Sequence, residues 1–117
     1  MKVLNIHTLG GNLPPNSLYI GNKNTQYHLE KSKYANPFYL ENWSREKKIK
    51  MFEEWLLLEI EDGRITKLEL ANLFGKDLVC FCNPKPCHGD ILRKYIIQSY
   101  YELNRGSTLS LSPNKTL

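Results

Sequence analysis

The chain has 117 residues, of which 41% are hydrophobic and 24% are charged, so it is long enough for one hydrophobic core and has a globular composition. No apolar run approaches the roughly 20 residues that a membrane-spanning helix needs, which argues against a membrane partner. The formal charge of +4 would help an anionic partner such as a nucleotide, phosphate or nucleic acid to approach, and it fits a solubilising surface equally well.

Two short strands are predicted in the first part of the chain. Apolar residues alternate loosely over residues 2–7 and stop at the turn-rich segment 8–12. A second apolar run, residues 18–20, ends at Gly21, and we expect its Tyr19 to lie in the core. Residues 22–42 are polar and have no sustained period, and a connection this long in a small domain is usually functional or mobile.

Two helices are predicted next. Ser44 precedes a strong helical pattern that stops at Asp62 and Gly63. Thr66 and the following Glu69 have the spacing of a capping box, and Gly75 stands where a glycine often ends a helix. The second helix is therefore predicted over residues 67–74.

A strand and a long helix complete the pattern. Residues 77–82 form a β-rich apolar run, and apolar residues recur at helical spacing over residues 91–103. The order strand, strand, helix, helix, strand, helix predicts a single α/β domain over residues 1–105, Rossmann-like, with two or three layers and a short, mostly parallel sheet. Residues 106–117 have neither period and are predicted to form a C-terminal tail.

The stretch GKDLVCFCNPKPCHGDILRKY, residues 75–95, contains all three cysteines of the chain. Ligands of α/β sheets bind beyond the carboxyl ends of the strands, so residues 82–90 are expected to form the site. Pro84 and Pro86 restrict the loop between strand and helix, which is typical of a loop that presents groups. Cys82, which ends the strand, and Asn83 are expected to contact the ligand.

Cys87 is predicted to stand at the start of the last helix, where the partial positive charge and the N–H groups stabilise a thiolate and attract anions. We predict three catalytic residues: Cys87 as a reactive thiolate, His88 as a proton carrier or a cation beside it, and Asp90 as a helix cap or a group that orients the substrate. Gly89 would let the backbone approach the ligand closely.

Two other interpretations of these residues remain open. Cys80, Cys82, Cys87 and His88 are a legitimate set of zinc ligands, although their C-x-C-x4-C-H spacing differs from the usual C-x2-C. Alternatively, Cys80 and Cys82 are small core residues and His88 only hydrogen-bonds a loop, and for Cys80 we prefer this packing role. The main prediction needs no cofactor.

The cysteine pattern and the first residues suggest a reducing compartment. Three cysteines, two of them separated by one residue, do not form a usual secreted disulfide framework. The start MKVLNIHTLGG has no long apolar stretch and no small-residue cleavage site. We therefore expect reduced thiols and a cytoplasmic location.

Three segments resemble the motifs of a known family: YIG at residues 19–21, ANPF at residues 35–38 and GKDLVCFCNPKPCHGDIL at residues 75–92. They resemble YIGR, GNPF and GKDLxCWCxPxPCHGDxL in small bacterial and phage proteins known as domain of unknown function 4326. This sequence differs at Asn22, Ala35 and Phe81, where the family has arginine, glycine and tryptophan. A fainter similarity to an uncharacterised α/β family with a C-x-E…CHR ending, which keeps the Cys–His pair, argues against an obligatory four-ligand zinc site.

The resemblance implies no activity, but it points to the same corner of the fold. Asn36 and Phe38 of the second motif are expected to fold over the site, with an amide for a base edge or a phosphate and a ring for stacking. The alternative for this motif is a turn with an anchored aromatic ring. Gly21, which ends the first motif, is also predicted to contact the ligand.

These residues favour an enzyme or a ligand-binding domain for a nucleotide-like or other anionic small molecule. One alternative is a phage or bacterial accessory protein that acts by binding another protein through exposed Trp43, Tyr100 and Tyr101. The other is a basic module whose helices contact the phosphates of a nucleic acid. Its contacts would come from Arg45, Lys47, Lys48, Lys50, Arg93 and Lys94.

Overall fold

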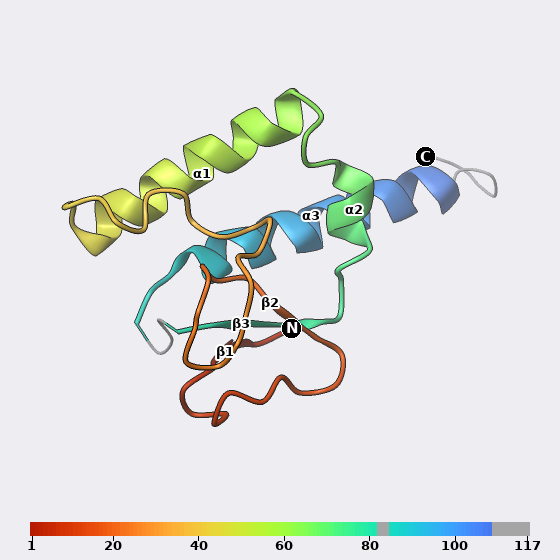
Figure 1. The fold of residues 1–117 in the computed structure, drawn as a ribbon. Helices are drawn as coiled ribbons and strands as arrows, with labels where there is room; N and C mark the ends of the chain where they lie inside the picture. The colour runs from red at the N-terminus through yellow and green to blue at the C-terminus, as the bar shows by residue number, and fades with distance from the viewer. Residues whose placement is uncertain (82–84, 109–117) are drawn as a thin grey trace.

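The computed structural model describes residues 1–81 and 85–108, with only the backbone for residues 106–108. The predicted ligand contacts Cys82 and Asn83, and residues 109–117 of the predicted tail, lie outside the described residues. The elements follow in the predicted order (Figure 1). They are β1 (Val3–Asn5), β2 (Ser17–Tyr19), α1 (Arg45–Glu61), α2 (Lys67–Ala71), β3 (Asp77–Cys80) and α3 (His88–Thr108).

The three strands form one parallel sheet in the order β1-β3-β2. The last strand in the sequence is therefore the central one, and its Leu78 pairs with Val3 on one side and Leu18 on the other. A central parallel strand is covered on both faces, which explains the continuous apolar run that predicted it. The α/β class with a short parallel sheet is confirmed.

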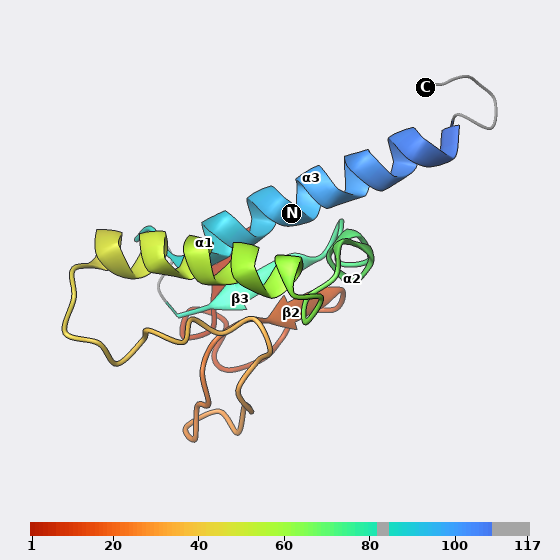
Figure 2. The same cartoon turned by 90° about the horizontal axis from the view of Figure 1, so that it is seen from above.

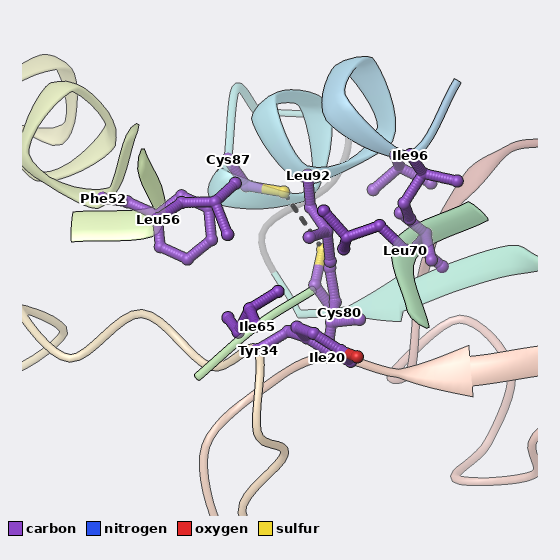
Figure 3. Close-up of a cluster of buried hydrophobic side chains, with 12 residues drawn as sticks. Ile20, Tyr34, Phe52, Leu56, Ile65, Leu70, Cys80, Cys87, Leu92 and Ile96 are labelled. Atoms are coloured by element: carbon purple, nitrogen blue, oxygen red, sulfur yellow. Dashed lines mark hydrogen bonds between the residues drawn. The ribbon is translucent and has the colours of Figure 1, made fainter. Parts of the chain in front are cut away.

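All three helices cover the same face of the sheet, and the irregular segments that follow β1 and β2 cover the other (Figures 1 and 2). Successive residues of β3 point to opposite faces. Leu78 and Cys80 pack on the helix side, whereas Val79 packs with Ile6 and Tyr19 on the loop side. The helix side of the core, drawn in Figure 3, includes Phe52, Leu56, Leu70, Leu92 and Ile96. The helices thus make one layer on the sheet, which is the two-layer form of the prediction.

Local capping decides where the helices begin and end. The Ser44 side chain accepts the backbone N–H of Lys47 at the start of α1, and the capping box of Thr66 and Glu69 is present at the start of α2. The prediction that the second helix reaches residue 74 was wrong, because α2 ends at Ala71. The N–H groups of Leu73 and Phe74 bond to carbonyls three residues back, and these turns let Phe74 stack on Tyr100 of α3 at 3.8 Å between ring centroids.

The last helix is the longest element, and it begins at His88 as predicted. It extends to Thr108 and so includes the first residues of the predicted tail. Among residues 1–81 and 85–108, no helix has both the length and the apolar character that crossing a bilayer requires.

Candidate functional site

A cavity of about 570 Å³ lies at the carboxyl edge of the sheet. Asn5 ends β1, Gly21 follows β2, Cys80 ends β3 and His88 begins α3, and all four line the cavity. The carboxyl ends of parallel strands meet at one edge, and the first turn of the crossover helix starts there. The cavity therefore lies where the strand-loop-helix motif predicted a site.

Basic side chains dominate the charge of this cavity. Arg45 and Lys48 from the first turns of α1, and Lys85 from the loop before α3, line it, whereas no Asp or Glu does so among the described residues. Arg45 donates to the Pro86 carbonyl at 3.2 Å and Lys48 donates to the Tyr39 carbonyl at 2.9 Å. Within the part of the chain that the structure describes, none of the three cations forms an ion pair. Their charges therefore remain available to an anion in the cavity.

Aromatic rings supply the apolar part of the wall. Tyr39, Trp43 and Phe81 all line the cavity, and the rings of Tyr39 and Phe81 meet edge to face with centroids 5.6 Å apart. Phe38 does not line it but packs against Trp43, with 5.4 Å between the ring centroids. Lys47 covers the Trp43 ring at 4.5 Å from its centroid. Phe38 thus supports a ring of the site rather than forming its wall.

Asn36 is buried, lines the cavity and ties the loop to α1. Its side-chain amide donates to the Lys48 carbonyl at 3.2 Å, and its Oδ1 accepts the Phe38 N–H at 2.9 Å. The Asn22 amide in turn donates to the Asn36 carbonyl at 3.4 Å. These bonds hold the Asn-Pro-Phe turn against the first turns of α1, where the basic side chains of the site begin.

Cys87 stands directly before α3, and its bonds cap that helix. Its sulfur accepts the Gly89 N–H at 3.2 Å, and its own N–H donates to the Asp90 carboxylate at 3.1 Å. This reciprocal pattern satisfies N–H groups that a helix start otherwise leaves open. Cys87 lines the cavity, whereas Asp90 does not and acts as the cap. These two N–H groups already have acceptors, so an anion in the cavity would be held by basic side chains instead.

His88 is buried and joins α3 to the end of β2. Its Nε2 lies 2.7 Å from the Ile20 carbonyl oxygen, which can only accept, so Nε2 carries a hydrogen. The edge of the ring packs against Phe52 with 4.9 Å between centroids. His88 lines the cavity beside Cys87, with its ring orientation set by this bond.

The two predicted ligand-binding glycines have different surroundings. Gly21 lines the cavity, and a Cβ there would lie 2.5 Å from the Tyr19 hydroxyl, which donates to the Asn22 carbonyl at 2.6 Å. Gly89 does not line the cavity, and a Cβ there would lie 2.9 Å from Ile20 Cδ1. Glycine at position 89 lets α3 sit close to the sheet.

The predicted zinc ligands are only partly described, because Cys82 is outside the described residues. Elsewhere in the described chain, no group of three His, Cys, Asp or Glu side chains is placed to hold a metal ion. Cys80 is buried in the core, as expected, and its sulfur lies 3.4 Å from that of Cys87. The zinc site stays a prediction.

Several cavity residues were not predicted as ligand contacts. Arg45 and Lys48 were predicted on a nucleic-acid surface and Trp43 at a protein interface, and no role was predicted for Tyr39 or Lys85. The spacing of Arg45 and Lys48, three residues apart on one face of a helix that follows the Asn-Pro-Phe motif, was the signal available.

The three aromatic anchors predicted for a protein partner differ in exposure. Trp43 is only partly exposed, and Tyr100 is stacked on Phe74. Tyr101 is 57% exposed. The rings of Tyr100 and Tyr101 meet edge to face with centroids 5.3 Å apart, and the protein interface stays a prediction.

Comparisons with known proteins agree with the sequence motifs. Residues 4–98 match the family model described as domain of unknown function (DUF4326). Over 49 residues the chain is 49% identical to an uncharacterized 12.4 kDa protein in the nrdA-td intergenic region of Enterobacteria phage T4. That match covers 42% of this chain and 45% of the phage protein, and no solved structure matches the chain. Because the family model spans most of the sequence, the chain belongs to the family with this domain of unknown function (DUF4326).

Proposed function

We propose that the protein binds a nucleotide-like anionic small molecule in the cavity at the carboxyl edge of the sheet. The observation that carries the proposal is the set of cations without ion-pair partners among the described residues, Arg45, Lys48 and Lys85, in a cavity without a described acidic wall residue. Gathering three positive charges around one cavity is costly unless an anion offsets their mutual repulsion. A bound phosphate or carboxylate supplies that charge.

The rest of the wall favours a nucleotide over a simple inorganic anion. Tyr39, Trp43 and Phe81 offer aromatic rings on which a base can stack, and stacking does not depend on which base is present. The amides of Asn5 and Asn22 can donate to and accept from a base or a sugar. The volume of about 570 Å³ lies within the usual range for small-molecule sites.

Cys87 and His88 are the groups through which the bound molecule would undergo chemistry. The Gly89 N–H and the start of α3 both favour a thiolate at Cys87, which would act as the nucleophile. His88 lies in the same wall and holds its Nε2 hydrogen against Ile20, so any proton it accepts enters at Nδ1. The proposal itself concerns binding. If the protein converts a bound nucleotide and Cys87→Ala abolishes that turnover, the proposal extends to catalysis.

Calorimetric titration with nucleoside mono-, di- and triphosphates at low salt tests the proposal. We expect saturable binding of one ligand per chain, and we expect Lys85→Gln to weaken it by about 10- to 150-fold, because one charge-assisted hydrogen bond contributes about 1.5–3 kcal/mol. Lys85 is exposed and makes no side-chain hydrogen bond to another described residue, so this change should leave the fold intact. Lys48→Gln provides a second cavity variant.

Lys50→Gln is the control. Like Lys48→Gln it removes one lysine charge from α1, but Lys50 does not line the cavity. We expect its affinity to stay within about twofold of wild type, as distant surface charges are screened by salt. Equal losses for Lys85→Gln and Lys50→Gln, or no binding of any nucleotide, would refute the proposal. Binding of a single-stranded oligonucleotide alone, with a steep salt dependence, would favour the nucleic-acid module instead.

A further inference from the structure

We propose that Cys80 and Cys87 form a redox-active pair that closes reversibly to a disulfide. The two sulfurs lie 3.4 Å apart across the junction between β3 and α3, and Figure 3 shows them facing each other. A disulfide requires a separation of about 2.05 Å, so the sulfurs need to approach by only about 1.4 Å. Rotation about the Cα–Cβ bonds is the motion that we expect to bring the sulfurs together.

The surroundings of the two thiols differ in a way that assigns their roles. Cys87 accepts the Gly89 N–H at the start of α3, and a hydrogen bond to sulfur together with the helix dipole stabilises a thiolate. Cys80 ends β3, so its own backbone belongs to a strand and not to the first turn of a helix. Cys87 is therefore the attacking thiolate, and Cys80 is the thiol that resolves the intermediate.

A small oxidant reaches this pair from the cavity. Cys80 and Cys87 are 1% and 3% exposed, yet both line the 570 Å³ cavity at the carboxyl edge. A buried thiol pair without a cavity beside it would be closed to peroxide. Here the hollow that holds the basic residues also gives access to the sulfurs.

The reaction with hydrogen peroxide is balanced as follows. The Cys87 thiolate attacks one peroxide oxygen, the O–O bond breaks, and the leaving hydroxide takes up a proton to become water. The Cys87 sulfenic acid is then attacked by Cys80, an S–S bond forms, the S–O bond breaks, and a second water leaves. Two thiols lose two electrons and two protons in total, and a dithiol reductant reverses the change by thiol exchange.

The test uses the whole chain with Cys82→Ser, so that two cysteines remain. After treatment of the folded protein with hydrogen peroxide, we expect the titratable thiols to fall from two to none per chain and peptide mapping to identify a Cys80–Cys87 link. Dithiothreitol should restore both thiols. In the Cys80→Ala and Cys82→Ser double variant, Cys87 should stop at the sulfenic acid, which dimedone traps.

The same measurements define the results that overturn the proposal. Thiols that stay titratable in the folded protein, while the chain unfolded in urea is oxidised, contradict an internal pair. Links that form between chains and appear as dimers on a non-reducing gel contradict it as well. If the alanine variant does not fold, peptide mapping of the wild-type chain decides between a Cys80–Cys87 link and one that involves Cys82. A link through Cys82 in folded wild type also contradicts the proposal.

Discussion

Replacing Gly89 with alanine perturbs the closest approach of α3 to the sheet. The new Cβ would lie 2.9 Å from Ile20 Cδ1, 3.1 Å from Val3 Cγ1 and 3.2 Å from Cys87 Sγ. Ile20 is fully buried and Val3 lies in a strand, so neither side chain has open space into which to retreat. The substitution therefore inserts one methyl group into a filled interface.

The expected cost is the difference of two effects. Overpacking of a core costs about 1–3 kcal/mol, whereas alanine in place of glycine in a helix gains about 0.5–1 kcal/mol. We expect Gly89→Ala to lower the free energy of unfolding by up to about 2.5 kcal/mol, measured by urea denaturation followed by circular dichroism.

A double-mutant cycle with Ile20→Val identifies the cause, because valine lacks the Cδ1 atom that the new methyl group meets. Ile20→Val alone should cost about 0.5–1.5 kcal/mol, and the double variant should be more stable than the sum of the two losses by about 1 kcal/mol. Ile96→Val is the control, since it removes the same methyl group from another buried position seven residues along α3. An additive cycle with Ile20→Val, or a stabilised Gly89→Ala, would refute the packing argument.

Two further predictions concern α2 and the turn that follows it. Burial raises the pKa of Glu69, but hydrogen bonds from Tyr34, the Thr66 N–H and Lys33 lower it further, so the net pKa falls below the ordinary 4.5. The ionised Glu69 stabilises the fold fully above pH 4.5, and this stabilisation is lost as the pH falls through the lowered pKa of the folded protein. Glu69→Gln should therefore cost about 1–3 kcal/mol at pH 7 and much less at pH 3 in urea titrations. A stability difference between wild type and Glu69→Gln that does not change with pH would contradict this. Gly75 has φ +92° with nothing within 4 Å of a Cβ, so Gly75→Ala should cost about 1–2 kcal/mol through the backbone alone and add to Ile20→Val without coupling.

Local patterns were sufficient to predict most of the elements. Ser44 and the pair Thr66 and Glu69 are contacts within one helical turn, so the starts of α1 and α2 followed from the sequence. The end of α2 did not, because it depends on Phe74 reaching Tyr100 of α3, a partner 26 residues away in the chain. Parallel pairing also joins distant segments, and the central place of β3 between β1 and β2 came only from the structure.

The candidate site also has features that follow from local sequence and features that depend on tertiary contacts. The sequence alone determined that Cys87 and His88 stand at the start of a helix that follows a strand, because strand and helix patterns act between near neighbours. The tertiary structure decided that Arg45, Lys48 and the aromatic rings line the same cavity as Cys87 and His88, and that the Cys80 sulfur faces Cys87. It also decided that Asp90 caps α3 and that Gly89 lets α3 pack closely against the sheet. These facts depend on where α1 and α3 sit on the sheet, and that is set by the burial of side chains from segments far apart in the chain.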